Sequence, residues 1–299
     1  MPCFKRNRRT ANHLLFSIIA YTVITAVSIL CLLPFLLVVT GSITDENAIY
    51  KFGFTLIPKK ISFFAYSVIL KSPFAMLRAY GVTVTVTLIG TILGLFITAM
   101  TAYVLCRKDF KYRNIFSFFF YFTTLFNGGL VSYYIFMVRY LQIKDTYYAL
   151  LLPLLLNVFY LLIMRNFMNS IPFSIIESAK IDGADDFTIF IKIIIWVITP
   201  ALASIGLFIA LSYWNDWFNG MLFLEDHKRF PLQYMLYRII NSVRFASSMT
   251  ARSGVPAPRM PQQSIKMAMT VFATGPIIFL YPFLQKYFVR GITIGAVKG

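Results

Sequence analysis

LLFSIIAYTVITAVSILCLLPFLLVVT, which runs from Leu14 to Thr40, contains no charged side chain. About 20 apolar residues in an α-helix, at about 1.5 Å per residue, cross the hydrocarbon core of a bilayer, which is about 30 Å thick. The apolar region of a signal peptide is shorter, about 7–15 residues, and precedes a small-residue cleavage site that this stretch lacks. We therefore expect a retained membrane-spanning helix here.

The whole chain has the composition of a membrane protein. Of its 299 residues, 59% are hydrophobic and 13% are charged, and the mean hydropathy is +0.72. Soluble domains are about 45–50% apolar and about 25% charged, so a soluble core could not bury this much apolar surface. The apolar runs are continuous rather than alternating, which favours helices over the strands of a barrel. Six runs are long enough to span a bilayer: 14–40, 80–105, 115–138, 148–168, 193–217 and 265–288.

Prolines and glycines predict local features of these spans. Gly90 and Gly94 form a G-x-x-x-G pair that would let another helix approach the second span closely. Gly128 and Gly129 could loosen the third span, or could simply serve packing. A proline ring removes a backbone donor and kinks a helix. Kinks are expected at Pro34, Pro153, Pro276 and Pro282.

Basic residues predict how the spans are oriented. The N-terminus, residues 1–13, and the connection 107–113 are both rich in Lys and Arg, as cytoplasmic segments are. We expect both termini and the loops after the second and fourth spans in the cytoplasm, with 41–79 and 218–264 as long external loops. The net charge of +17 is spread along the loops, which suits anionic lipid headgroups better than nucleic acid.

The sequence offers no catalytic or metal-binding constellation. The cysteines Cys3, Cys31 and Cys106 form no C-x-x-C pair, and the two histidines lack ligand-type neighbours at metal spacing. A phosphate loop of the G-x-x-x-x-G-K-[ST] type is also missing. We expect a chain that is not an enzyme and holds no cofactor or metal.

Residues 169–192, between the fourth and fifth spans, predict a helix, a turn and a second helix. Ser174 and Glu177 fit a capping box, and Gly183 can adopt the left-handed conformation that ends a helix. Asp185 and Asp186 suit the positive N-terminus of the following helix. These signals alone predict a cytoplasmic helical elbow, for which a simple connector is the more economical interpretation.

The residues of this elbow resemble a known signature. Glu177-Ser178-Ala179-Lys180-Ile181-Asp182-Gly183 is similar to the E-A-A-x-x-x-G coupling-helix motif of ABC importer permeases. The segments 126–130, 163–167, 281–288 and 290–299 also resemble the maltose-type carbohydrate permeases, especially the branch that serves complex oligosaccharides. Ser178 replaces the usual second alanine, and Trp196 stands where the family usually has proline.

This resemblance implies an all-α permease of a bacterial plasma membrane, with one transmembrane domain over residues 14–299. It would work with a second, homologous permease, two ATPase subunits that bind ATP and Mg, and an extracellular solute-binding protein that delivers an oligosaccharide. The residues that contact the ATPases would be Glu177, Ser178, Ala179, Asp182, Gly183 and Ala184 in the elbow, and Gly295, Ala296, Val297, Lys298 and Gly299 in the tail.

Sugar contacts would come from aromatic and amide side chains, because sugar rings stack on aromatics and hydrogen-bond to amides. The same side chains also serve ordinary helix packing, so both roles stay open. The candidates are Asn127, Asn157, Tyr160, Tyr213, Trp214 and Asn215.

Two other classes of function fit the sequence less well than import driven by ATP. An ion-coupled secondary transporter usually places ionisable residues inside the membrane, at a cost of about 3 kcal/mol or more, and the middles of these spans hold almost none. A membrane enzyme would need a nucleophile or an acid–base pair at a membrane face. Glu225 and Asp226 are adjacent carboxylates, but such a pair on a predicted external loop is typical of a solvated surface.

Overall fold

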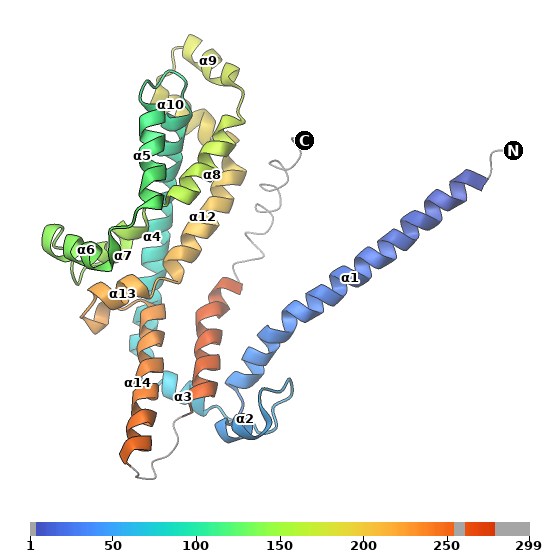
Figure 1. Cartoon of the computed structure of the whole chain (residues 1–299), viewed down its shortest axis with the longest axis vertical. Helices are drawn as coiled ribbons and strands as arrows, with labels where there is room; N and C mark the ends of the chain where they lie inside the picture. Colours follow the sequence, from blue (N-terminus) through green and yellow to red (C-terminus); the bar gives the residue numbers. More distant parts are fainter. Residues whose placement is uncertain (1–3, 254–260, 279–299) are drawn as a thin grey trace. The chain divides into compact units, whose positions relative to one another are not determined.

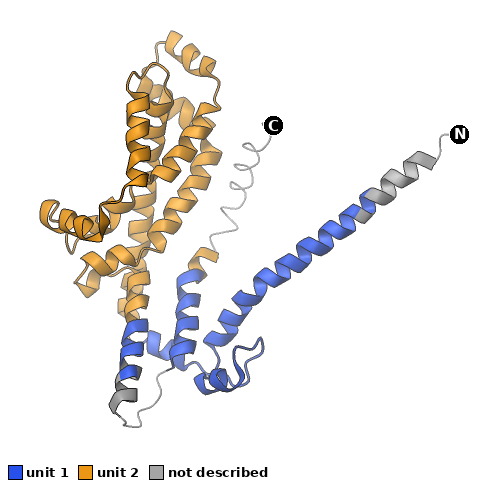
Figure 2. Cartoon of the chain, viewed as in Figure 1, with its two compact units in different colours: residues 1–71, 240–274 blue, residues 72–239, 275–299 orange. Residues whose placement is uncertain are grey.

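The computed structural model describes residues 4–253 and 261–278 (Figure 1). Over these residues the chain is helical, apart from turns and one isolated antiparallel bridge between Thr44 and Ile61. It forms two compact units, one of residues 1–71 and 240–274 and the other of residues 72–239 and 275–299 (Figure 2).

The first unit begins with α1 (Phe4–Ser42), whose part from Phe16 onward is long and apolar enough to cross a membrane. Pro34 lies inside α1, and the helix continues through it. The short helices α2 (Glu46–Phe52) and α3 (Phe64–Ile69) follow, so the predicted external loop 41–79 is partly helical. A further helix covers residues 262–278 and contains Pro276.

Glu46 joins α2 to the helix at 262–278 within this unit. Its buried carboxylate accepts hydrogen bonds from the backbone N–H groups of Gln263 and Ser264, both at 2.9 Å, and from the Ser264 hydroxyl at 2.8 Å. Amides in the first turn of a helix have no partner within the helix, and the helix dipole favours a negative charge there. A single acidic side chain therefore caps this helix.

The second unit is built around α4 (Pro73–Cys106). This helix packs against α8 (Val158–Asn169) and α12 (Thr199–Trp214), with α5 (Arg113–Leu125) beside it (Figure 1). The side chains at the centre of these contacts are fully buried, among them Ala102, Leu161, Met164, Phe190 and Ile205.

The G-x-x-x-G prediction is confirmed in α4. A Cβ on Gly90 would lie 2.4 Å from Cζ of Tyr213, and a Cβ on Gly94 would lie 3.0 Å from the carbonyl oxygen of Leu155. The two glycines therefore let α12 and the segment before α8 approach the backbone of α4.

The third predicted span is broken at Gly128 and Gly129, the pair that was expected to loosen it. α5 ends at Leu125, and α6 (Gly129–Ile135) with the π-helical η1 (Phe136–Tyr140) leaves at an angle of 115°. The break is local backbone chemistry: Gly129 has φ +81°, and its N–H donates to Oδ1 of Asn127 at 2.9 Å.

The fourth and fifth predicted spans are also bent. α7 (Tyr148–Leu151) and the 3₁₀ turn η2 (Leu152–Leu154), which contains Pro153, meet α8 at 48°. The run of α10 (Asp186–Ile189), η3 (Phe190–Ile194) and α11 (Ile195–Val197) meets the following run Thr199–Phe223, which begins with α12, at 84°, with Pro200 in the first turn of α12.

The described residues provide two helices that could span a membrane alone, and up to five spans if each bent pair counts as one. Residues 265–278 of the sixth predicted span are helical, whereas 279–288, with Pro282, lie outside the described residues. A total of six spans therefore stays a prediction.

The predicted external loop 218–264 is largely helical. It contains α13 (Phe218–Phe223), the 3₁₀ turn η4 (His227–Arg229) and α14 (Leu232–Ser253). Asp145, which has φ +55°, accepts hydrogen bonds from the N–H groups of Glu225 (3.2 Å) and Asp226 (3.1 Å) and pairs with Arg229 at 3.2 Å. One carboxylate thus holds the start of this segment to the turn before α7.

The Gly90→Ala variant is expected to lower the free energy of unfolding by about 1–3 kcal/mol, because a methyl group must displace the buried Tyr213 ring. The matched control is Gly81→Ala on the same helix, where a Cβ would meet no atom within 4 Å. Thermal unfolding of the purified protein in detergent compares the two variants. Equal midpoints for both would show that the approach of α12 to Gly90 contributes nothing to stability.

Candidate functional site

α9 (Phe173–Ile181) lies at the end of the second unit where α4 and α8 end and α10 begins (Figure 1). It is a helix, as predicted, but the predicted capping box is wrong. The helix starts directly after Pro172, which has φ −58° and ψ 128° and provides no side-chain cap. Ser174 and Glu177 therefore fall inside the helix instead of closing its first turn.

The turn that ends α9 confirms the prediction for Gly183. This residue has φ +81°, its N–H donates to the carbonyl of Lys180 at 3.0 Å, and the N–H of Ala184 donates to the carbonyl of Ala179 at 3.0 Å. These two bonds form a Schellman motif, in which a residue with positive φ satisfies the last carbonyls of a helix.

α9 has an inner and an outer face. Ile176 and Ala179 are buried in the core of the second unit, so the small size of Ala179 serves packing within this chain. Ile181 is 86% exposed. The other predicted coupling residues are exposed or half-buried: Glu177, Ser178, Asp182 and Gly183 are exposed, and Ala184 is half-buried.

A cluster of charged side chains connects α9 to the end of α4. Arg107, only 7% exposed, donates to Asp109 through Nε at 2.7 Å, to the Tyr103 hydroxyl at 3.1 Å, and to Asp186. Lys180 of α9 lies 3.2 Å from Oδ2 of Asp109 and 3.7 Å from Oδ1 of Asp186. We call Arg107, Asp109, Lys180 and Asp186 the charge cluster.

The contact between Arg107 and Asp109 shifts the pKa values of both groups toward their charged forms. Hydrogen bonds from Arg107 hold the pKa of Asp109 below its usual range, and the bond to Asp109 is likewise the main cause of the raised pKa of Arg107. A lowered carboxylate pKa stabilises the folded state above the pKa of the unfolded chain, and this stability is lost as the pH falls through the lower folded value. The Arg107–Asp109 pair therefore persists under mildly acidic conditions.

Sequence reasoning did not find this cluster. Arg107 and Asp186 are 79 positions apart, and each had a different local explanation, a basic loop and a helix start. Nothing in the spacing of the residues indicates that these side chains meet.

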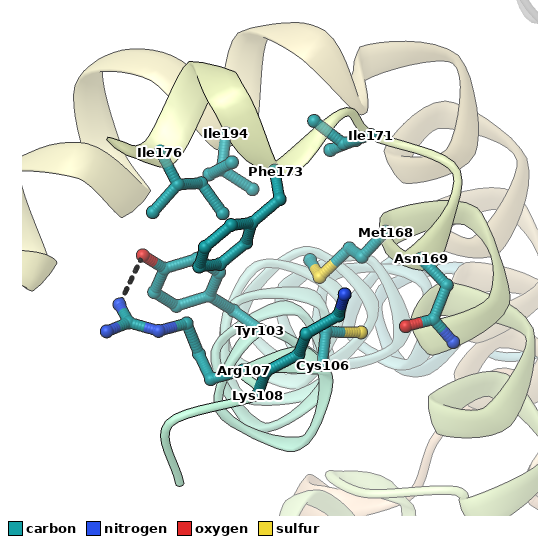
Figure 3. A pocket seen from close by; sticks show the side chains of 10 residues that line it. All are labelled: Tyr103, Cys106, Arg107, Lys108, Met168, Asn169, Ile171, Phe173, Ile176 and Ile194. Carbon is teal, nitrogen blue, oxygen red and sulfur yellow. Dashed lines mark hydrogen bonds between the residues drawn. The ribbon is translucent and has the colours of Figure 1, made fainter. Parts of the chain in front are cut away.

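A cavity of about 180 Å³ lies beside the cluster, between the ends of α4 and α8, the start of α9, and η3 (Figure 3). Lys108 lies with Nζ 5.8 Å from the centroid of the Phe173 ring. The side chains around the cavity are mostly apolar, including Tyr103, Cys106, Met168, Ile176 and Ile194. The space between the inner face of α9 and the ends of α4 and α8 is thus only partly filled by side chains.

Three of the predicted sugar contacts are asparagines at helix ends. Asn127 and Asn157 each accept a hydrogen bond at 2.9 Å from the backbone N–H two residues later. Asn215 ends α12, donating to the Leu211 carbonyl at 2.9 Å and accepting from Gln233 at 3.1 Å. All three are exposed, and all three have a structural role.

The three predicted aromatic contacts lie on α8 and α12. Tyr213 and Trp214 are buried, and the Tyr213 hydroxyl donates to the carbonyl of Leu151 at 2.7 Å. The ring of Tyr160 stacks on Phe208 with centroids 6.1 Å apart. The predicted contacts therefore fall into three places: the last turn of α12 with α8, the break at Asn127, and the break at Asn157.

The predicted tail contacts, Gly295 to Gly299, lie outside the described residues. Among the residues that the structure describes, no three His, Cys, Asp or Glu side chains form a group that could hold a metal ion.

Comparisons with known proteins cover almost the whole chain, although no family model matches it. It is 38% identical over 285 residues to the polygalacturonan/rhamnogalacturonan transport system permease protein YtcP of Bacillus subtilis (strain 168), covering 95% of this chain and 99% of that protein. It is also 38% identical over 275 residues to protein LplC of the same organism, covering 91% of each chain.

A solved structure agrees with these sequences. The chain superposes on the crystal structure of a bacterial ABC transporter involved in the import of the acidic polysaccharide alginate, with a TM-score of 0.75 and 29% identity. The match covers 96% of this chain and 100% of that chain.

Proposed function

This chain belongs to the permeases of ABC sugar importers, and we propose that it carries complex oligosaccharides inward across a bacterial plasma membrane while α9 receives the motion of an ATPase. The observation that supports this proposal is the match to such permeases over nearly the full length of both chains. The family favours import driven by ATP over the alternative of an ion-coupled secondary transporter.

The proposed complex contains this chain, a second, homologous permease, two ATPase subunits and an extracellular solute-binding protein. The missing phosphate loop supports the division of labour, because ATP and Mg must then be bound by a partner. In this arrangement α9 and both termini face the cytoplasm, and the tail 295–299 reaches the ATPases.

The outer face of α9 has the chemistry of a docking surface. Ile181 projects an apolar side chain that is 86% exposed, and burying such a side chain is worth about 1.5–3 kcal/mol. Glu177 and Asp182, exposed on the same helix and its cap, can pair with basic groups of an ATPase. Ser178 is small enough to allow close contact beside them.

For the sugar, accessible candidates lie at three places. Asn127 and Asn157 are exposed at two separate breaks in the helices, where the direction of the chain changes. Tyr160 is half-buried on α8 and Asn215 is exposed at the end of α12, whereas Tyr213 and Trp214 are mainly packing residues. We propose the first four as the sugar contacts that this chain contributes.

The chain purified alone is expected to hydrolyse no ATP. Phosphate release is measured for the isolated permease, and then after the ATPase subunits have been added to it in proteoliposomes. Hydrolysis is expected only in the second case. Robust hydrolysis by the isolated chain would contradict the division of labour.

The imported oligosaccharides are expected to carry acidic sugars. One relative is a permease of a polygalacturonan/rhamnogalacturonan transport system, and a structural relative belongs to a transporter of the acidic polysaccharide alginate. Cells with the complete transporter are given a labelled uronate oligosaccharide and the same compound with its carboxylates reduced to alcohols. Faster uptake of the reduced compound would assign neutral sugars instead.

The Gly183→Asp variant is expected to uncouple transport from hydrolysis. A side chain in the left-handed region costs about 1–2 kcal/mol and opens the Schellman turn that ends α9. The added carboxylate also lies next to Asp182 and near Asp185. Sugar uptake should fall while ATP hydrolysis continues, measured in proteoliposomes that contain the complete complex, with subunit association checked by copurification.

The matched control is Gly53→Asp, since Gly53 also has a positive φ, +71°, and a Cβ there also meets no atom within 4 Å. Gly53 has ψ −167°, a region that is essentially restricted to glycine, so the substitution introduces at least comparable strain at the end of α2, away from α9 in the sequence. If both variants transport like the wild type in normally assembled complexes, α9 is only a connector and the proposed function of this helix fails.

A further inference from the structure

We propose that Arg107 is a positioning residue for coupling, because the charge cluster around it makes α9 and α4 move as one body. The inference rests on the proposed function of α9 as the helix that receives motion from an ATPase. It adds a second route for that motion, through side chains, to the covalent route through the chain.

The covalent route runs through a non-helical connection at each end of α9. Residues 170–172 lead into the helix from α8 and residues 182–185 lead out to α10, and neither connection continues a helix. A push on α9 that travelled only through these connections would be absorbed in part by changes in their dihedral angles. A rigid transmission therefore needs contacts that bypass the connections.

The charge cluster provides such a bypass. Arg107 stands directly after the last residue of α4, and its guanidinium contacts Tyr103 within α4, Asp109 in the following loop and Asp186 at the start of α10. Lys180, in the last turn of α9, contacts both of these carboxylates. The planar guanidinium fixes the direction of its donors, so the two carboxylates are held in a defined geometry.

The electrostatics make the cluster hold as a unit. Its two cations and two carboxylates sum to zero charge, and Arg107 is almost fully buried. A buried charge that loses its partner is costly, so the cluster resists opening one bond at a time. The contacts at Lys180 are the weaker part of the cluster, because its side chain is 41% exposed and those of Asp109 and Asp186 are 50% and 60% exposed. They can transmit motion because Arg107 holds both carboxylates in place.

Through α4, the motion of α9 would reach the core of the second unit. α4 packs along both α8 and α12, so a displacement at its Arg107 end reaches the helices that form this core. Tyr103, which bonds Arg107, is itself buried against the ring of Phe190 with centroids 5.4 Å apart. Through Tyr103 the cluster is also connected to the π-helical start of the bent fifth span.

The first test compares Arg107→Gln and Lys180→Gln with a control, Lys144→Gln, which removes the 2.6 Å pair with Glu225 elsewhere in the second unit. Sugar uptake per ATP hydrolysed is measured for the complete complex in proteoliposomes. We expect the first two variants to lower this ratio about fivefold or more. Fivefold is the smallest effect that coupling between two sites commonly has. The control should leave the ratio unchanged. If Arg107 and Lys180 have only a structural role, their variants will yield less assembled complex, but each complex will import as much sugar per ATP as the wild type. That result would overturn the inference.

The second test replaces the charges by a reversible covalent link. In a background with Cys3, Cys31 and Cys106 changed to serine, Asp109→Cys and Lys180→Cys are introduced, which leaves the Arg107–Asp186 pair in place. The double variant is expected to show a lowered ratio, and linking its thiols with a bifunctional methanethiosulfonate reagent should restore it. Two results would contradict the inference. Uptake could stay low after linking, or linking could abolish uptake and dithiothreitol, which breaks the link, could restore it. Either result would show that α9 and residue 109 must separate during transport.

The two proposals fail in different ways. If Gly183→Asp uncouples transport and the Arg107 and Lys180 variants do not, α9 keeps its proposed function and the side-chain route is refuted. If none of these variants alters the ratio, the proposed function of α9 fails as well.

Discussion

The constraint on which the rest of this structure depends is that backbone N–H and C=O groups in hydrocarbon need partners within the protein. Continuous helices satisfy it over most of the described chain, and each break has to satisfy it with local chemistry. At the break after α5, Asn127 accepts the N–H of Gly129, and at the start of α8, Asn157 accepts that of Phe159. At the bend before α12, Pro200 occupies the first turn, where a missing N–H leaves no unpaired donor.

This constraint also explains which parts of the fold could be predicted from the sequence. Apolar runs of the required length have only one economical conformation, so helices were predictable, as was the close approach at Gly90 and Gly94. The bend at Pro153 was predicted as a proline kink. The 115° break after α5 and the bend before α12 were not, because Asn127 with Gly129 can also be accommodated in a straight or kinked helix. Whether such residues break a helix depends on the tertiary contacts on either side, such as those of α8 with α4.

The candidate site shows the same division. The turn at Gly183 follows from local backbone preferences, and the structure has the two hydrogen bonds that this preference requires. The inner and outer faces of α9 depend on what lies beneath it, which is why Ala179 faces the core while Ser178 faces outward. The charge cluster depends on residues from α4, a loop, α9 and α10, so only the folded chain brings it together.

The bend between the helical run that starts at α10 and α12 explains why this chain can have Trp196 at a position where the family usually has proline. Trp196 stands where such permeases usually have proline, and its side chain is 73% exposed. The bend of 84° lies just after it, between Val197 and Thr199, where Ile198 leaves the helical conformation. A proline at the first turn of α12 fixes this change of direction, so the bend does not need a second proline four residues earlier. The aromatic side chain is then free to face the surroundings of the helix, where a membrane interface favours tryptophan.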